Sequence, residues 1–255
     1  MTLFAAADKA AIVSDIQSDR LISVAANYFP GVELRTDYIY SKLLAAEANA
    51  EHRLRVFVEP VVILSEGATQ ADQDALDAAG TRYTDEPAYD MEPSFFRGDS
   101  WGFMVLRHHP VQSIESVKFV YPSPFNGVFE VPLEWVRIDK KYGHMRLVPT
   151  SASFAAPLSM FIMQAMAGGR VFPNFIQVRY TAGLTTTDYP DLVDLIKKMA
   201  VKRIIDDLYL PQSASDSIDG MSQNFSFDSS KYSESIDKQL ESLRQEIHGV
   251  RMMVM

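Results

Sequence analysis

The sequence predicts an α+β fold in which a β-rich subdomain is inserted into a helical module and a C-terminal arm ends in a helix. Two stretches, near 37–57 and 190–209, carry apolar residues at helical spacing, and the stretch between them consists of short β-branched and aromatic runs. The expected domains are a helical core module (1–65 and 185–211), an inserted β-rich subdomain (66–184), and a polar arm with a C-terminal amphipathic helix (212–255).

The first long helix is predicted over residues 37–57. Thr36 or Asp37 can cap its start, and Glu59-Pro60 follows its end. Its apolar positions recur at spacings of three and four: Ile39, Leu43, Leu44, Ala46, Ala50, Leu54 and Phe57.

The inserted region begins with a polar stretch over 66–80, which indicates a loop or a short exposed helix. The segment Asp139–Gly143 lies between two strand-like runs and indicates a hairpin, because Gly143 can adopt a positive φ. The predicted strands are 103–106, 116–121, 128–131, 135–139, 144–148 and 175–180.

Helical periodicity returns after Pro190, where apolar residues step by four from Leu192 to Leu208. We expect this helix and the first long helix to pack together as one module. The stretch 212–230, rich in Ser, Asp and Asn, is predicted to be a linker or an arm that orders on a partner, because it has too few apolar residues to fold alone.

The last segment, 231–255, carries apolar residues that alternate spacings of four and three, which is typical of a heptad seam. A stripe this narrow favours docking against another helix over covering a globular core. The residues expected to bind a partner or a neighbouring subunit are Ile236, Leu240, Leu243, Ile247 and Val250, with Phe225 and Phe227 in the polar arm.

Charge and composition limit the function classes. A formal net charge of -9 and a pI near 5.0 disfavour tight binding of double-stranded DNA, although DNA can pass an acidic wall without sticking. The absence of cysteine excludes disulfides, thiolate catalysis and cysteine-ligated metals. Neither the start of the chain nor the interrupted apolar stretch 154–172 indicates a secretory signal or a membrane span, so we expect no membrane partner.

One motif suggests catalysis. The run 98–102, Gly-Asp-Ser-Trp-Gly, matches the pattern that exposes a nucleophilic serine at a strand-to-helix turn, which makes a serine hydrolase using Ser100 the alternative function. The residues that follow are strand-like, and no histidine has a flanking signature, so a turn is the favoured interpretation. His108 and His109 are predicted at the end of a strand, where neighbouring side chains point to opposite faces, so the pair cannot readily chelate one metal. We therefore expect no catalytic residue, no metal site and no cofactor.

The layout of helix, β region, helix and tail resembles head–tail connector (adaptor) proteins of tailed bacteriophages. The segments that carry the resemblance are 43–60 (LLAAEANAEHRLRVFVEP), 131–149 (VPLEWVRIDKKYGHMRLVP) and 188–247, which holds the second helix, the polar arm and the C-terminal helix. They cover about three-fifths of the chain. The chain departs from the smallest members in its long inserted β region.

The resemblance implies a structural, non-enzymatic protein of the virion neck, assembled in the host cytoplasm. Such a protein forms a homo-oligomeric ring, usually a dodecamer, that joins the portal protein to a stopper or tail-completion protein. The ring lines the channel through which DNA passes as non-specific cargo. Another tail or capsid accessory protein remains an alternative with the same assembly physics.

Overall fold

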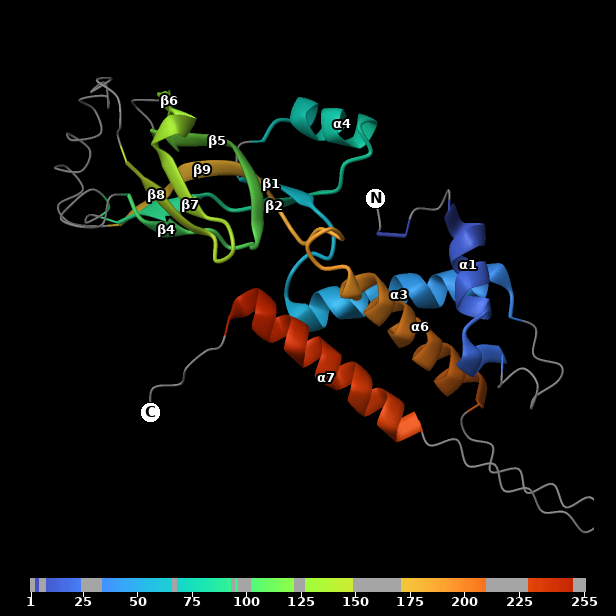
Figure 1. Cartoon of the computed structure of the whole chain (residues 1–255). Coiled ribbons are helices and arrows are strands. Elements are labelled where there is room, and N and C mark those ends of the chain that lie inside the picture. Colours follow the sequence, from blue (N-terminus) through green and yellow to red (C-terminus); the bar gives the residue numbers. More distant parts are fainter. Residues whose placement is uncertain are drawn as a thin grey trace, which may run out of the picture. The chain divides into compact units, whose positions relative to one another are not determined.

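The computed structural model describes residues 3–4, 8–23, 34–65, 68–92, 95, 102–121, 127–148, 171–209 and 229–249. The chain divides into two compact units (Figure 1). Unit 1 combines Met1–Val58 with Thr186–Met255, and unit 2 is the intervening segment Glu59–Thr185. Unit 1 is helical and unit 2 contains two sheets, so the predicted α+β class with a β-rich insertion is confirmed.

The described part of unit 1 includes the helices α1 (Lys9–Gln17), α3 (Thr36–Leu54), α6 (Asp191–Tyr209) and α7 (Ser229–His248), and residues 20–23 are also helical. The predicted spacing becomes one buried face on α3, made by Ile39, Leu43, Ala46, Ala50 and Leu54. These side chains stabilise the unit because burying each large aliphatic one removes its surface from water, at about 1.5–3 kcal/mol apiece.

The two long helices lie side by side, as the sequence predicts. Tyr38 Oη, in the first half of α3, donates to Asp207 Oδ2 near the end of α6 at 3.2 Å, and Lys42 forms an ion pair with the same carboxylate. The expected cap at Thr36 or Asp37 is wrong, because α3 begins at Thr36 and its N-cap residue is Arg35, without a side-chain cap bond. Arg55 ends the helix with a left-handed φ of 58°.

Unit 2 contains a six-stranded sheet with the order β2-β1-β9-β5-β6, in which β3 also pairs with β9, and a three-stranded sheet with the order β4-β8-β7. The elements are β1 (Val61–Ser65), α4 (Gln70–Ala78), β2 (Tyr83–Glu86), β3 (Tyr89–Met91), β4 (Met104–Val105), β5 (Val111–Val120), β6 (Val128–Glu130), η2 (Leu133–Trp135), β7 (Val136–Asp139), β8 (His144–Leu147) and β9 (Phe172–Ala182).

Opposite faces of the larger sheet are covered by different elements. On one face, Val62 and Leu64 of β1 pack against Leu76 of α4. The other face includes Tyr180, which is fully buried and whose Oη accepts a hydrogen bond from His108 N at 3.3 Å, in the segment directly after β4. The helix α4 and the three-stranded sheet therefore lie on opposite sides of the larger sheet (Figure 1).

The boundary between the helical module and the inserted subdomain differs from the predicted one. The chain order β1–α4–β2 places residues 61–65 in unit 2. Residues 61–65 were expected with the helical module, but they form β1, which lies inside the sheet of unit 2 between β2 and β9. All five are buried, so the strand has no polar face and no alternation that would mark it as a strand. The stretch 66–80 contains α4, whose start is closed by a capping box between Thr69 and Asp72.

The remaining strand predictions agree with the structure to within a few residues at their ends. The predicted hairpin at Asp139–Gly143 is confirmed, since β7 and β8 pair antiparallel across it and Gly143 has a φ of +68°. The structure extends the run 116–121 to Val111–Val120 and the run 175–180 to Phe172–Ala182. These two long strands are hydrogen-bonded partners at the centre of the sheet.

Candidate interaction surfaces

The heptad seam of α7 faces the inside of unit 1. Ile236, Leu240, Leu243 and Ile247 are only 4%, 3%, 8% and 1% exposed. Polar contacts join α7 to α3: Arg53 Nη2 lies 2.8 Å from Asp237 Oδ1, and the His248 ring is hydrogen-bonded to Leu54 O at 2.7 Å. The groove that this seam requires is therefore supplied by the chain's own helices, and in this arrangement the four side chains do not face a partner.

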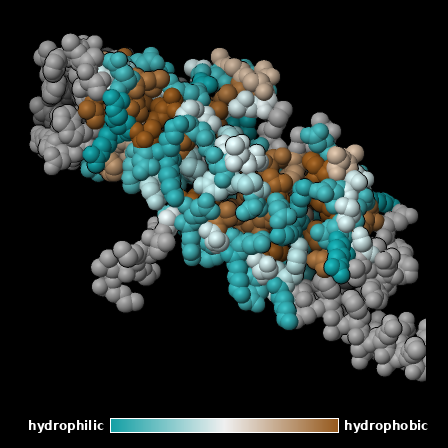
Figure 2. Space-filling model, in the orientation of Figure 1, coloured by the Kyte–Doolittle hydropathy of each residue, from teal (hydrophilic) through white to brown (hydrophobic). Residues whose placement is uncertain are grey.

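Figure 2 shows hydrophilic side chains along the outer side of α7, as expected for an amphipathic helix whose apolar stripe is turned inward. A hollow of about 370 Å³ runs along this side. Its lining is entirely exposed and comes from α7 alone, namely Lys231, Glu234, Ser235, Lys238, Gln239 and Ser242. The hollow is the solvent face of the helix.

The other residues singled out from the sequence lie outside the described residues. They are Phe225, Phe227 and Val250 of the expected partner-binding set and Ser100 of the alternative hydrolase.

The outer face of the three-stranded sheet carries aromatic and cationic side chains together. We call it the basic face and define it by Phe103, Val105, Arg137, Lys141, Tyr142, His144 and Arg146. Its apolar members are exposed to an unusual degree, at 41% for Phe103, 47% for Val105 and 38% for Tyr142. Large apolar side chains gathered at one exposed place are typical of binding surfaces.

Contacts within the basic face hold its side chains in place. The rings of Phe103 and His144 meet edge to face at 5.6 Å, and Arg146 lies over the Phe103 ring at 5.6 Å. Tyr142 packs against His144 at 5.9 Å, and Lys141 lies over the Tyr142 ring at 5.7 Å. The alternation along β8 explains the arrangement, because His144 and Arg146 point outward while Met145 and Leu147 are buried.

The cations of this face are available for a partner. Among the described residues, Arg137, Lys141 and Arg146 form no ion pair with a carboxylate. Arg137 donates to the backbone oxygens of Glu134 and Val136 at 2.7 and 3.2 Å, which orients its guanidinium without neutralising it. Asp139 pairs with His144 between β7 and β8 and lies on the same exposed face, so three cations and one carboxylate leave a net positive charge there, on a chain whose formal net charge is -9.

The basic face was not predicted from the sequence. Lys141 and His144 appear in the sequence as part of a hairpin turn and as a histidine without a signature. The signal that could have found it is the alternation of Tyr142, His144 and Arg146 with smaller or apolar residues, since side chains two apart on a strand share a face. Phe103 joins them only through the pairing of β4 with β8.

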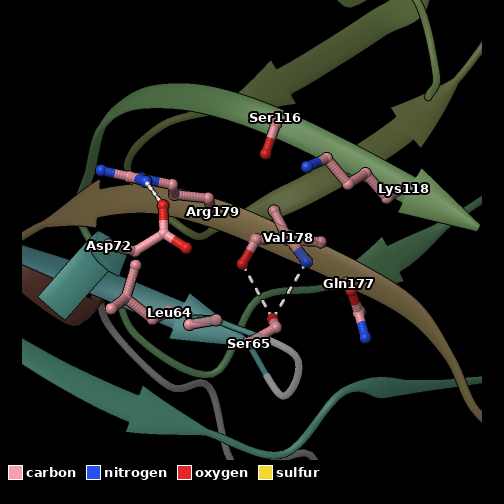
Figure 3. A pocket seen from close by; sticks show the side chains of 9 residues that line it. Leu64, Ser65, Asp72, Ser116, Lys118, Gln177, Val178 and Arg179 are labelled. Carbon is pink, nitrogen blue, oxygen red and sulfur yellow. Dashed lines mark hydrogen bonds and ion pairs between the residues drawn. The ribbon is translucent and has the colours of Figure 1, made fainter. Parts of the chain in front are cut away.

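A second feature of the larger sheet is a small cavity beside α4, with a volume of about 80 Å³ (Figure 3). Arg179 lines it and forms ion pairs with Asp72 at 3.2 Å and Glu115 at 2.6 Å. Ser65 Oγ donates to Val178 O at 2.8 Å and accepts from Val178 N at 3.0 Å. Sites for small organic ligands occupy roughly 300–1,000 Å³, so this cavity is too small for one.

A buried carboxylate lies on the other face of the same sheet. Tyr180 Oη donates to Glu86 Oε2 at 3.3 Å, and the guanidinium of Arg107 lies 3.7 Å from that oxygen. Burial raises the pKa of Glu86, while hydrogen bonds from Tyr89 and Tyr180 and the charge of Arg107 oppose the shift. Because Arg107 N also donates to Tyr89 Oη at 3.0 Å, the cluster joins β2, β3 and β9 to the segment after β4.

His108 is part of this packing, since its backbone N–H donates to Tyr180 Oη. Burial lowers the pKa of His108, with a further contribution from the charge of Arg107. The described ranges contain no group of three or more histidine, aspartate or glutamate side chains placed to hold a metal ion. None of their helices has the length and apolar character of a membrane span.

No model of a known protein family matches the chain, and no curated protein matches it. A solved chain described as "Neck of empty GTA particle computed with C6 symmetry" is similar to it over 94% of both chains, at 13% sequence identity and a TM-score of 0.36. A TM-score of 0.36 does not establish a shared fold.

Proposed function

We propose that the chain is a structural protein of a phage neck, a head–tail adaptor whose copies form a ring between the portal protein and the stopper or tail. The observation that carries a binding role is the basic face, where aromatic, aliphatic and arginine side chains are exposed together. Aromatic residues and arginine are enriched at protein–protein interfaces. The resemblance of segments 43–60, 131–149 and 188–247 supports the choice of the adaptor family.

The division of the chain also supports this proposal. The inserted unit 2 is built around its own core, and unit 1 is closed by α7 on α3 and α6. A chain with two such units can bind one neighbour through each. In the proposed neck, unit 1 contacts the portal protein, and the inserted unit contacts other copies and the proteins below.

The residues proposed to contact the portal protein are chosen by their apolar character in the sequence. The seam of α7 is used inside unit 1, so the other three residues of the predicted partner-binding set, Phe225, Phe227 and Val250, are the proposed portal contacts. Apolar residues in a polar stretch gain binding energy only when a partner buries them. DNA passes through the ring as non-specific cargo, because a net charge of -9 does not retain it.

The experiment removes the chain's gene from the phage that encodes it and images the particles. We expect DNA-filled heads and separate, unattached tails, with attachment restored by supplying the protein. Complete infectious particles without the protein would overturn the proposal. A serine-reactive fluorophosphonate probe tests the hydrolase alternative, and we expect no labelling of the purified protein at Ser100.

A further inference from the structure

We propose that the basic face of one copy binds the acidic surface of α4 on the next copy, in a head-to-tail contact that repeats around the ring. The inference rests on the proposed ring and names the two surfaces that meet in it. We call the second surface the acidic face and define it by Asp74, Asp77 and Asp85 around Tyr83.

The acidic face is exposed and carries charge that the chain does not neutralise. Asp74 and Asp77 lie on α4 and Asp85 on β2, and all three are exposed. Burial raises the pKa of Tyr83, and the charges of these three nearby carboxylates raise that pKa further. Gln70 donates to Asp74 at 2.9 Å and Gln73 donates to Asp85 at 3.4 Å, which orients these two carboxylates.

Asp72 also lies on α4 but is not part of the acidic face. It accepts from Thr69 in the capping box and forms an ion pair with Arg179 at 3.2 Å, so its charge is used within unit 2. Among the described residues, Asp74, Asp77 and Asp85 form no ion pair. Three carboxylates without an ion pair on one face thus stand against three such cations, Arg137, Lys141 and Arg146, and one carboxylate, Asp139, on the other.

The two faces point away from each other. Leu76 of α4 packs on Leu64 and Val62 of the larger sheet, so the polar side of α4 is turned away from that sheet. The three-stranded sheet covers the opposite face and buries Met145 and Leu147, so its basic face is turned away in the other direction. Figure 1 shows α4 and the strands β4, β7 and β8 well separated within unit 2.

Opposed, complementary faces favour a heterologous contact. A surface that pairs with itself gives a twofold dimer, whereas two different surfaces on opposite sides give a ring when the rotation between copies closes. Charge complementarity sets the register of such a contact and speeds its formation. The exposed Phe103, Val105 and Tyr142 add the apolar area that charges alone do not provide.

The other occupant that fits a basic, aromatic face is a nucleic acid, since cations contact phosphates and aromatic rings stack on bases. The chain's net charge of -9 opposes that occupant and favours an acidic protein surface that is presented by every copy. The partner of the basic face is therefore a second copy of the chain.

The test uses two charge-reversed forms of the full chain. The first carries Lys141→Glu and Arg146→Glu, which makes both faces acidic, and the second carries Asp74→Lys and Asp77→Lys, which makes both faces basic. All four positions are exposed. Asp77 lies in the last turn of α4, where a lysine interacts favourably with the helix dipole. A control with Glu92→Lys and Glu130→Lys repeats the second charge change at exposed sites outside both faces.

Association is measured by sedimentation velocity at low ionic strength. We expect the wild type and the control to associate, and each reversed form alone to lose association by about tenfold or more, because like charges then face each other. An equimolar mixture of the two reversed forms should associate again, since each acidic face then meets a basic one, and added salt should weaken the mixture.

A mixture that stays as dissociated as its components would overturn the proposal. So would a Lys141→Glu/Arg146→Glu form that associates like the wild type but no longer retains a double-stranded DNA fragment, because the occupant would then be nucleic acid. If the mixture fails while particle assembly still requires the protein, only this contact is refuted. If the mixture associates again but normal particles form without the protein, the neck role is refuted instead.

Discussion

Replacing Leu240 with alanine tests whether α7 belongs to the core of unit 1. Leu240 is 3% exposed and lies in the middle of the seam, between Ile236 and Leu243. The change removes three carbon atoms, worth about 0.8 kcal/mol of transfer free energy each, and leaves a cavity. We therefore expect the free energy of unfolding of unit 1 to fall by about 2–5 kcal/mol.

The assay can separate the two units. Both tryptophans of the chain, Trp101 and Trp135, belong to unit 2, whereas most of the helical residues belong to unit 1. In urea, the circular dichroism transition should shift to lower denaturant in the Leu240→Ala form, and the tryptophan fluorescence transition should keep its midpoint. Gln239→Ala, at the exposed neighbour, is the matched control and should change the stability by less than about 0.5 kcal/mol.

An unchanged circular dichroism transition in the Leu240→Ala form would refute this reasoning. The seam would then contribute nothing to unit 1, and α7 would be free to dock on a partner, as its narrow heptad stripe first indicates.

Three further changes test unit 2. Gly183→Ala should lower its free energy of unfolding by roughly 2–4 kcal/mol by tryptophan fluorescence, because the new Cβ would lie 2.3 Å from Glu59 O and φ is +136°; an unchanged midpoint would contradict this close approach. Thr69→Ala removes the capping box of α4 and should cost about 1 kcal/mol, measured in the same way, whereas no loss would mean that the cap is not formed. Glu86→Gln should remove a pH dependence: because the folded pKa of Glu86 is raised above its usual 4.5, the wild type loses stability as pH rises from that value through the raised pKa, and the variant should not. Equal slopes in both forms would exclude Glu86 as the titrating group.

The helices of this chain could be predicted from the sequence because their signal is local. Ile39, Leu43, Ala46 and Ala50 repeat at the spacing of one helix face, and that face is the buried one. The strand Val61–Ser65 could not be predicted in the same way, because it is buried on both faces and its five residues show no alternation.

The apolar spacing of the C-terminal segment predicts the helix α7 but does not predict which helices it packs against. The spacing of Ile236, Leu240, Leu243 and Ile247 predicts the helix and its apolar stripe correctly, but it contains no information about which helices supply the groove. The basic face was missed for a related reason. It forms only when β4 pairs with β8 and brings Phe103 beside His144, two residues 41 positions apart in the sequence.

The most direct test of the proposed neck role is a cryo-electron microscopy map of the neck in particles assembled by the phage that encodes this chain. We expect a ring of copies between the portal and the tail, with density that fits the two sheets of unit 2 and the helices α3, α6 and α7 of unit 1. A neck whose density is fully accounted for by other chains would contradict the proposed function.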